Sequence, residues 1–283
     1  MITRRGLLLG SLGVAGLAAL GIAGVETGIL PGVDDLPAGV PGVQAGRMLS
    51  GSFVSAKRHG ATTGWSISWP PGHDSGVPVL IVLHGRGGDH ASAFGGGLHL
   101  DRYLAAAVEH GTPPFAVASV DGGEHSYWHP RRDGDSAGMV VDEFVPLLAH
   151  HGLATARIAF LGWSMGGYGA LYLASVLGHQ RVAAAVAESP AIWHQAGQSA
   201  PGAFDDAADF DAHSILNRLN RLAGIALRID CGDADGFAPT TRDLRGALSP
   251  IPAGGIESGH HDMTFWRSQA AAQLRFAGAH LGA

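Results

Sequence analysis

The chain has 283 residues, of which 46% are hydrophobic and 15% charged, with a formal net charge of −6 at pH 7. This apolar content is enough for one large or two small folded domains and excludes a largely disordered chain. The negative balance does not suggest a basic face for a phosphate backbone, so nucleic acid is not expected as a partner. The one cysteine, Cys231, excludes an internal disulfide and a cysteine-based zinc site. Because Cys231 ends an apolar run, we expect a buried, unreactive thiol.

The first 28 residues are predicted to direct export. Arg4 and Arg5 precede an uncharged stretch, 6–25, and Leu7 stands two places after the second arginine. This arrangement resembles a twin-arginine export signal. The stretch approaches the ~20 residues that span a bilayer, although its many glycines and alanines suit a signal better than a permanent anchor. We therefore predict that residues 1–28 are an export signal or an N-terminal membrane anchor. The chain would then be secreted or held at the cell envelope, with a possible membrane association through this segment.

A linker is predicted to follow. Residues 29–46 are rich in proline and glycine and show no hydrophobic periodicity. The folded domain is expected to cover residues 47–283.

From residue 47 onward, short apolar runs alternate with segments of helical spacing. The predicted strands are 52–56, 64–69, 78–84, 115–120, 157–162, 182–187 and 225–231, and the predicted helices are 101–110, 140–149, 164–177, 240–247 and 265–280. The first two strands should form a hairpin. The alternation predicts an α/β fold with a mostly parallel central sheet and helices on both faces. A short insertion follows the sixth strand: residues 190–211 are longer than a normal connection, and we expect them to form a lid or a pocket wall.

A serine nucleophile is indicated by the stretch Gly-Trp-Ser-Met-Gly. Ser164 stands between Gly162 and Gly166, after a predicted strand and at the start of a predicted helix. A Gly-x-Ser-x-Gly turn from strand to helix exposes the serine oxygen, and the N–H of Met165 then faces the charge that develops on an attacked carbonyl. The alternative is an ordinary glycine-rich turn, because short glycine patterns also occur by chance. The strand before and the helix after favour the nucleophile.

An acid and a histidine follow in the order that such a nucleophile requires. Asp233 and Asp235 come after the strand 225–231, and His260 and His261 lie in a loop before the last helix. A histidine can take the serine proton and return it at neutral pH, and a carboxylate can orient the imidazole. The residues alone leave the choice within each pair open. One member of each pair is expected to cap a turn or lie in solvent.

A second backbone donor is predicted in the glycine-rich loop after the strand 78–84. The sequence His84-Gly-Arg-Gly-Gly lets the backbone approach a substrate closely, and the N–H of Arg86 is the expected partner of the Met165 N–H in an oxyanion hole. We expect His84 itself to be structural. A phosphate-binding loop is not favoured, because the Walker lysine is missing.

Four motifs in this order, LHGRGG, GWSMGGYGAL, CGDADGF and HHDMTFW, resemble the α/β-hydrolase fold. Within it they resemble the esterase D-like group, which includes S-formylglutathione hydrolases, feruloyl-type esterases and mycobacterial mycolyltransferases. The resemblance covers about residues 48–280. The group's Gly-x-x-Asp-x-Phe pattern matches Gly232, Asp235 and Phe237, which implies Asp235 as the acid. Its His-Asp-x-x-aromatic-Trp pattern matches from His261 to Trp266, which implies His261 as the base.

The resemblance implies a serine carboxylesterase that needs no metal or cofactor, with a small-molecule or glycolipid ester as substrate. Its triad would be Ser164, Asp235 and His261, with Glu188 as the reserve candidate for the acid. Four aromatic residues are expected around the substrate pocket: Tyr127, Trp128, Trp163 and Trp193. Two alternatives stay open, an acyltransferase of the mycolyltransferase type that acylates a sugar hydroxyl and a non-catalytic envelope binding protein. The connection 190–211 follows no member of the group, so the substrate stays unassigned.

Overall fold

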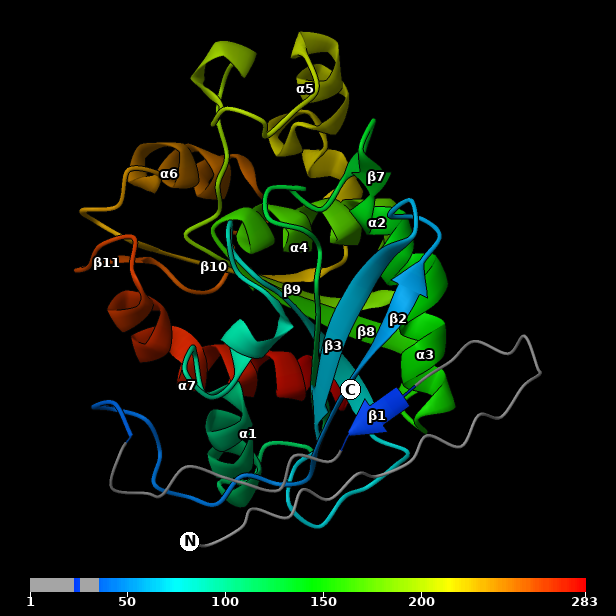
Figure 1. The fold of residues 1–283 in the computed structure, drawn as a ribbon. Coiled ribbons are helices and arrows are strands. Elements are labelled where there is room, and N and C mark those ends of the chain that lie inside the picture. The colour runs from blue at the N-terminus through cyan, green and yellow to red at the C-terminus, as the bar shows by residue number, and fades with distance from the viewer. Residues whose placement is uncertain (1–22, 26–35) are drawn as a thin grey trace, which may run out of the picture.

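A computed structural model describes residues 23–25 and 36–283 of the chain (Figure 1). Most of the predicted export segment and the first part of the predicted linker lie outside these residues. Within the described residues, no helix is both long and apolar enough to cross a membrane.

Nine strands of the described chain form one mixed sheet in the order β1-β2-β3-β5-β4-β8-β9-β10-β11. These strands are β1 Ala23–Val25, β2 Met48–Ser55, β3 Ala61–Ser68, β4 Pro78–Leu83, β5 Ala116–Val120, β8 Ala154–Trp163, β9 Val182–Glu188, β10 Ala226–Gly232 and β11 Ile256–Glu257. A separate small hairpin consists of β6 Pro130–Arg131 and β7 Gly134–Asp135. The β2–β3 hairpin and the β3–β5 pair are antiparallel, and all neighbours from β5 to β11 are parallel. The predicted hairpin and the mostly parallel sheet are confirmed.

Strand β1 was not predicted. It pairs antiparallel with β2, with Ala23 opposite Ser52. Without it, β2 would be an edge strand, whose outward backbone groups are open to pairing with any extended segment. A hydrophobicity pattern does not reveal a three-residue strand of this kind.

Helices cover both faces of the sheet (Figure 1). The helices of the described chain are α1 Leu100–Glu109, α2 Ser136–Met139, α3 Val145–His150, α4 Met165–Leu177, α5 Ala207–His213, α6 Ala238–Ala247 and α7 Met263–Leu281. Shorter turns are η2 His90–Ala93, the π turn η3 Val140–Phe144, and η4 Ala196–Gln198, η5 Ile215–Asn217 and η6 Leu219–Leu222. The predicted helix 140–149 is the end of a longer run made of α2, η3 and α3. Pro146 lies at the second position of α3 and has no backbone N–H to donate. It stands where the hydrogen-bonding pattern changes from the π turn to the α-helix.

The buried strand β4 shows how the two faces are filled. Leu80 and Val82 pack in the cluster that includes α1 and α7, whereas Val79, Ile81 and Leu83 pack in the cluster that includes α3 and α4. Alternate side chains of a strand point to opposite faces, so a strand covered on both faces is apolar throughout.

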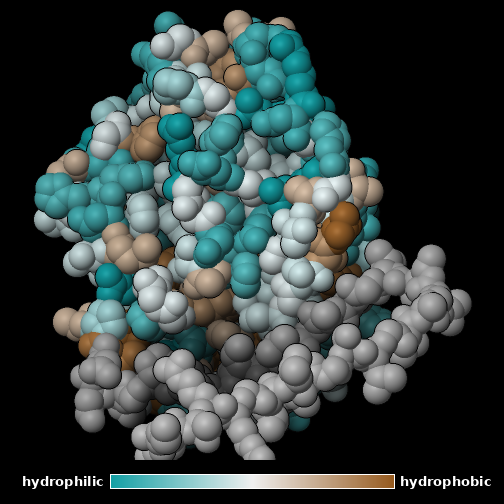
Figure 2. Space-filling view, in the orientation of Figure 1, coloured by the Kyte–Doolittle hydropathy of each residue, from teal (hydrophilic) through white to brown (hydrophobic). Residues whose placement is uncertain are grey.

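The predicted insertion, 190–211, lies within the connection between β9 and β10. Residues 189–225 connect β9 to β10 and include η4, α5, η5 and η6, and they form the upper part of the molecule above α4 (Figure 1). We call this segment the cap. Hydrophilic residues cover most of its surface in this orientation (Figure 2).

Candidate active site

The carboxyl ends of the parallel strands meet at one edge of the sheet. Leu83 pairs with Gly162, Trp163 with Glu188, and Gly232 with Glu257. From β4 the chain passes to β5 on one side, while β8 lies on the other side. The crevice outside such a switch point is where open α/β sheets bind ligands.

Ser164 follows β8 at this edge in a strained conformation. Its φ is +54° and its ψ −118°, in a region that costs a non-glycine residue about 1–3 kcal/mol. Backbone hydrogen bonds hold it there. The Ser164 N–H donates to the carbonyl of Glu188 at 2.9 Å, and the Ser164 carbonyl accepts from Tyr168 at 3.1 Å and from Ala191 at 3.0 Å. The hydroxyl is thereby fixed at the tip of a sharp strand-to-helix turn.

The two flanking glycines permit this turn. A Cβ at Gly162 would lie 2.2 Å from the carbonyl oxygen of Gly166, and a Cβ at Gly166 would lie 1.8 Å from the carbonyl oxygen of Leu83. Both contacts are with backbone, which cannot rotate away as a side chain can. The Gly-x-Ser-x-Gly spacing is therefore a steric requirement of this turn.

Three predicted side chains come together by hydrogen bonding. His261 Nε2 lies 2.9 Å from Ser164 Oγ, and His261 Nδ1 lies 2.7 Å from Asp235 Oδ2. A carboxylate only accepts, so the ring proton belongs on Nδ1 and the Nε2 lone pair faces the serine hydroxyl. This is the arrangement in which an imidazole can remove the serine proton.

Asp235 is fully buried at its side chain, yet it stays ionised near neutral pH. Burial acts to raise its pKa. Hydrogen bonds from His261, from the Phe237 N–H at 2.8 Å and from Ser189 outweigh this effect and hold the pKa of Asp235 below its usual value.

The other candidates lie elsewhere. Asp233 Oδ1 accepts from the Gly259 N–H at 3.1 Å, which fixes the loop that carries His261, and His260 is exposed. Glu188 is fully buried, and neither of its carboxylate oxygens has a hydrogen-bond partner among the described residues. Burial raises the pKa of Glu188 well above its usual value, which favours the neutral form of its carboxyl.

Two backbone segments border the serine hydroxyl. Met165 is the first residue of α4, and intrahelical bonding begins only with the Tyr168 N–H, so the Met165 N–H has no acceptor within its helix. Arg86 lines the pocket beside Ser164. The next two residues of its loop are tied back, with the Gly87 N–H donating to Glu124 at 2.8 Å and the Gly88 N–H donating to Gly85 at 3.1 Å.

His84 has a structural role, as expected. It is fully buried, its Nε2 accepts from the Gly122 N–H at 3.0 Å, and its Nδ1 lies 2.8 Å from the carbonyl oxygen of Gly85. Cys231 is also buried, and burial raises the pKa of its thiol to about 12, which leaves it inert.

A pocket of about 480 Å³ opens beside Ser164. Its aromatic and apolar lining consists of Tyr127, Trp163, Ala191, Trp193, Ala200, Phe237, Met263 and Trp266. Ala191, Trp193 and Ala200 come from the cap, so this segment forms a pocket wall.

Trp128 lies outside the pocket, contrary to the sequence expectation. It is fully buried, and its Nε1 donates to the carbonyl of His84 at 3.2 Å. Its ring fills the space that the absent side chain of Gly169 leaves. Both Tyr127 and Trp128 have positive φ, 51° and 55°, and this turn sends the two neighbouring side chains to different places.

The sequence reasoning missed Phe237 and Trp266 as site residues. Their rings flank the imidazole of His261, with centroids 5.4 and 5.1 Å away. Trp266 Nε1 also donates to Ser189 Oγ at 3.1 Å. Both residues belong to the motifs that identified Asp235 and His261, so the signal was present.

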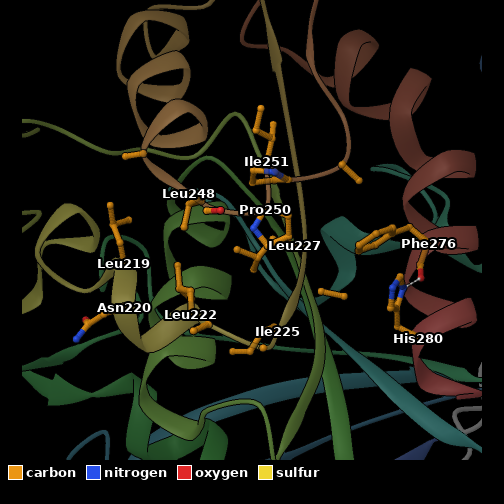
Figure 3. Close-up of a pocket in the computed structure, with 17 residues that line it drawn as sticks. Leu219, Asn220, Leu222, Ile225, Leu227, Leu248, Pro250, Ile251, Phe276 and His280 are labelled. Atoms are coloured by element: carbon orange, nitrogen blue, oxygen red, sulfur yellow. Dashed lines mark hydrogen bonds between the residues drawn. The ribbon is translucent and has the colours of Figure 1, made fainter.

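A second cavity, of about 430 Å³, lies between η6, β10 and the end of α7 (Figure 3). Leucine, isoleucine and proline side chains line it, and Phe276 and His280 close one side. It shares no lining residue with the pocket at Ser164, and we assign it no part in the chemistry.

Comparisons with known proteins give a family match and similar solved structures. The model of the family described as "Putative esterase" matches residues 57–249. No curated protein matches the sequence. A solved ferulic acid esterase superposes with a TM-score of 0.71 at 18% identity, covering 82% of this chain and 98% of its own. An S-formylglutathione hydrolase from Agrobacterium tumefaciens gives 0.69 at 17% identity, covering 84% of this chain and 96% of its own.

A third structure, a ferulic acid esterase from Anaeromyces mucronatus in complex with ferulic acid, has a TM-score of 0.65 at 16% identity and covers 90% of this chain and 96% of its own. At such low identity these structures establish the fold, which is that of the α/β-hydrolases. The family match spans more than half of the chain and includes Ser164 and Asp235. The chain therefore belongs to this esterase family and is a carboxylic ester hydrolase.

Proposed function

We propose that this protein is an exported serine carboxylesterase that works through an acyl-enzyme. The observation that carries the proposal is the hydrogen-bonded series from Asp235 to His261 to Ser164, with contacts of 2.7 and 2.9 Å, at the mouth of an apolar pocket. The strained turn at Ser164 supports it, because strain of this kind is retained where a nucleophile must be exposed.

In the proposed reaction, Ser164 Oγ attacks the ester carbonyl carbon while His261 Nε2 removes the hydroxyl proton. The carbon–oxygen bond to the alcohol then breaks, and His261 returns the proton to the departing alkoxide. Water, deprotonated by the same nitrogen, attacks the acyl-enzyme and releases the acid and free Ser164. Asp235 holds the imidazole and stabilises its charged form.

The backbone N–H groups of Arg86 and Met165 are proposed to stabilise the tetrahedral oxyanion. Removing one such donor typically costs about 3 kcal/mol of transition-state stabilisation. Their positions on either side of Ser164, in a tied glycine loop and at a helix start, support this role.

The substrate is proposed to be an ester with an apolar acyl group. Aromatic rings from the sheet edge, from the 121–128 loop and from the cap line one pocket, and a 480 Å³ volume accommodates a group of moderate size. Two of the similar solved structures are ferulic acid esterases, which supports a substrate with an aromatic acyl group.

Export is proposed from the sequence alone. The Arg4-Arg5 pair and the uncharged stretch after it support passage out of the cytoplasm, with the enzyme secreted or retained at the envelope. Cell fractionation tests this: Arg4→Lys with Arg5→Lys should leave the enzyme in the cytoplasm. Unchanged distribution of this variant contradicts a twin-arginine route.

Kinetics of Ser164→Ala test the proposed chemistry. Wild-type enzyme is first screened on p-nitrophenyl esters of graded acyl length and on feruloyl esters, with and without a sugar acceptor. Ser164→Ala should lose at least ~10³-fold in turnover on the best ester while keeping its circular dichroism spectrum. A variant with a near wild-type rate contradicts the proposal. Acylated sugar as the main product with acceptor present would instead identify a transferase.

A further inference from the structure

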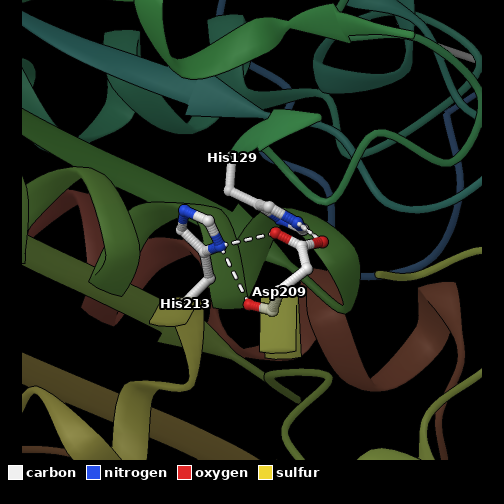
Figure 4. Close-up of side chains that lie close together, drawn as sticks. All are labelled: His129, Asp209 and His213. Carbon is white, nitrogen blue, oxygen red and sulfur yellow. Dashed lines mark hydrogen bonds and ion pairs between the residues drawn. The ribbon is translucent and has the colours of Figure 1, made fainter. Parts of the chain in front are cut away.

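His129, Asp209 and His213 come together behind the pocket wall (Figure 4). His129 belongs to the loop before β6, whereas Asp209 and His213 belong to α5 in the cap. One ligand atom from each residue, a ring nitrogen or a carboxylate oxygen, lies within 4.8 Å of the other two. Figure 4 shows the Asp209 carboxylate between the two imidazole rings. We propose that these three side chains bind a divalent transition-metal ion of the zinc type, which fastens the cap to the body of the enzyme.

The distances fit such an ion. His129 Nε2 lies 3.3 Å from Asp209 Oδ2, and His213 Nδ1 lies 2.7 Å from Asp209 Oδ1. Zinc holds nitrogen and oxygen ligands at about 2.0–2.1 Å in tetrahedral geometry, which separates neighbouring ligand atoms by about 3.3 Å. The three ligand atoms, now within 4.8 Å of one another, reach this separation by movement of the side chains around the cation. Two imidazoles and a carboxylate form a donor set that zinc, cobalt and nickel accept, with a further position for water.

The hydrogen bonds of His129 give an independent reason. Its Nδ1 lies 3.2 Å from the carbonyl oxygen of Tyr127, and its Nε2 faces the Asp209 carboxylate. Both partners are acceptors, whereas a neutral imidazole has a single N–H. With the proton on Nδ1, a lone pair on Nε2 faces the lone pairs of a carboxylate. A cation bound between His129 Nε2 and the Asp209 carboxylate accepts both lone pairs, so two metal–ligand bonds replace the repulsion.

The surroundings keep His129 neutral. The residue is fully buried, and its ring stacks on Phe204 with centroids 4.9 Å apart. An enclosed apolar setting disfavours a charged imidazole, and neutral imidazole is the form that binds metal.

The Tyr127 carbonyl gives His129 the outer-shell bond that metal-ligating histidines usually have, which fixes the ring and leaves Nε2 as the ligand atom. On the carboxylate, Asp209 Oδ2 also accepts from the Asp205 N–H at 2.8 Å, which orients it. His213 Nδ1 lies 2.9 Å from the backbone carbonyl oxygen of Asp209 and 2.7 Å from its carboxylate, so without the ion this nitrogen carries the ring proton. To bind the ion through Nδ1, that proton moves to Nε2, the nitrogen that Figure 4 shows on the far side of the ring.

The site is one layer behind the substrate pocket. Phe204, which stacks on His129, also contacts Tyr127 and Trp193, with centroids 6.3 Å away in each case. Tyr127 and Trp193 line the pocket. An ion here has no contact with the reacting ester and acts by holding the wall in place.

Zinc binding to the purified enzyme tests the proposal. The protein, without an affinity tag and stripped with a chelator, is titrated with Zn²⁺ in competition with a chromophoric chelator. Wild type should bind one equivalent per chain. His213→Gln should weaken binding by at least the ~10–100-fold that loss of an outer-shell partner costs. His194→Gln is the matched control, because His194 Nε2 forms an exposed pair with Asp243 at 3.1 Å.

Equal binding by wild type and His213→Gln overturns the proposal, as does an equal loss in His194→Gln. Should His213→Gln fail to fold, X-ray absorption on the wild type decides alone. Two imidazole nitrogens and a carboxylate oxygen at about 2.0–2.1 Å from zinc support the site, and an all-oxygen shell overturns it. Added Zn²⁺ should also raise the Tm of wild type but not of Asp209→Asn. A wild-type Tm that Zn²⁺ leaves unchanged means that a proton on His129 bridges the pair, which overturns the proposal.

Discussion

The nucleophile turn and the cap border the same pocket but are held by different kinds of contact. The turn at Ser164 depends on backbone hydrogen bonds and on two glycines that let backbone approach backbone. The cap depends on side chains from distant parts of the chain, such as Arg131 against Asp205 at 3.2 Å and the Tyr168 hydroxyl on the His213 carbonyl at 2.9 Å. Because backbone contacts hold the turn, the nucleophile requires the Gly-x-Ser-x-Gly spacing. Because side-chain contacts hold the cap, the residues with which it lines the pocket can differ without changing that turn.

The largest expected effect of a side-chain substitution is at Asp235, the acid that orients His261. Asp235→Asn should lower kcat by about 10³–10⁴-fold, because an amide favours the wrong imidazole tautomer. Asp233→Asn is the matched control and should stay within about tenfold of wild type, since it weakens one hydrogen bond to Gly259. Steady-state kinetics on one ester compare the two. A larger loss for Asp233→Asn would reverse the assignment of the acid.

The next largest effect is expected at Gly166, where the turn leaves no space for a side chain. Gly166→Ala places a Cβ 1.8 Å from the Leu83 carbonyl oxygen and should cost at least ~10²-fold in kcat/KM through displacement of Ser164. At Gly236, next to Asp235, a Cβ would meet no described heavy atom within 4 Å, so Gly236→Ala should stay close to wild type. Similar activity in both variants would remove the steric argument. A melting curve of each variant separates misfolding from local displacement.

A substitution in the cap should change selectivity rather than chemistry. Trp193→Ala removes one aromatic side chain from the pocket wall and should lower kcat/KM about tenfold for bulky acyl esters. The reason is that an apolar contact between pocket and substrate contributes roughly 1–3 kcal/mol to transition-state binding. The rate on p-nitrophenyl acetate, which does not reach the wall, should be nearly unchanged. An equal loss on both esters would show that the cap also supports the catalytic groups.

The smallest effect is on stability and comes from Glu188, whose carbonyl oxygen fixes the Ser164 N–H. Burial raises the pKa of its carboxyl well above 4.5 in the folded state, whereas in the unfolded chain the carboxyl ionises above this ordinary value of about 4.5. Unfolding then releases a proton, so wild type loses stability as pH rises above that value. Glu188→Gln should therefore raise Tm relative to wild type at pH 8, and the difference should shrink toward pH 4.5. A Tm difference independent of pH would mean that Glu188 is ionised in the fold.

The same contrast explains what the sequence could predict. Strands such as 78–84 and the Ser164 turn follow from local patterns, because a run of apolar residues or a pair of glycines carries the signal. Selection of Asp235 over Asp233 required the family resemblance, since both follow the same strand. The inward turn of Trp128 and the helix α5 depend on partners far away in the sequence, which no periodicity records.

Labelling with a fluorophosphonate probe tests whether Ser164 is the nucleophile. One label per chain is expected, located on Ser164 by peptide mapping, with activity lost in proportion to labelling. Ser164→Ala should take up no label. A label on another residue, or a fully labelled enzyme that still hydrolyses its best ester at the wild-type rate, would contradict the assignment of Ser164 as the nucleophile.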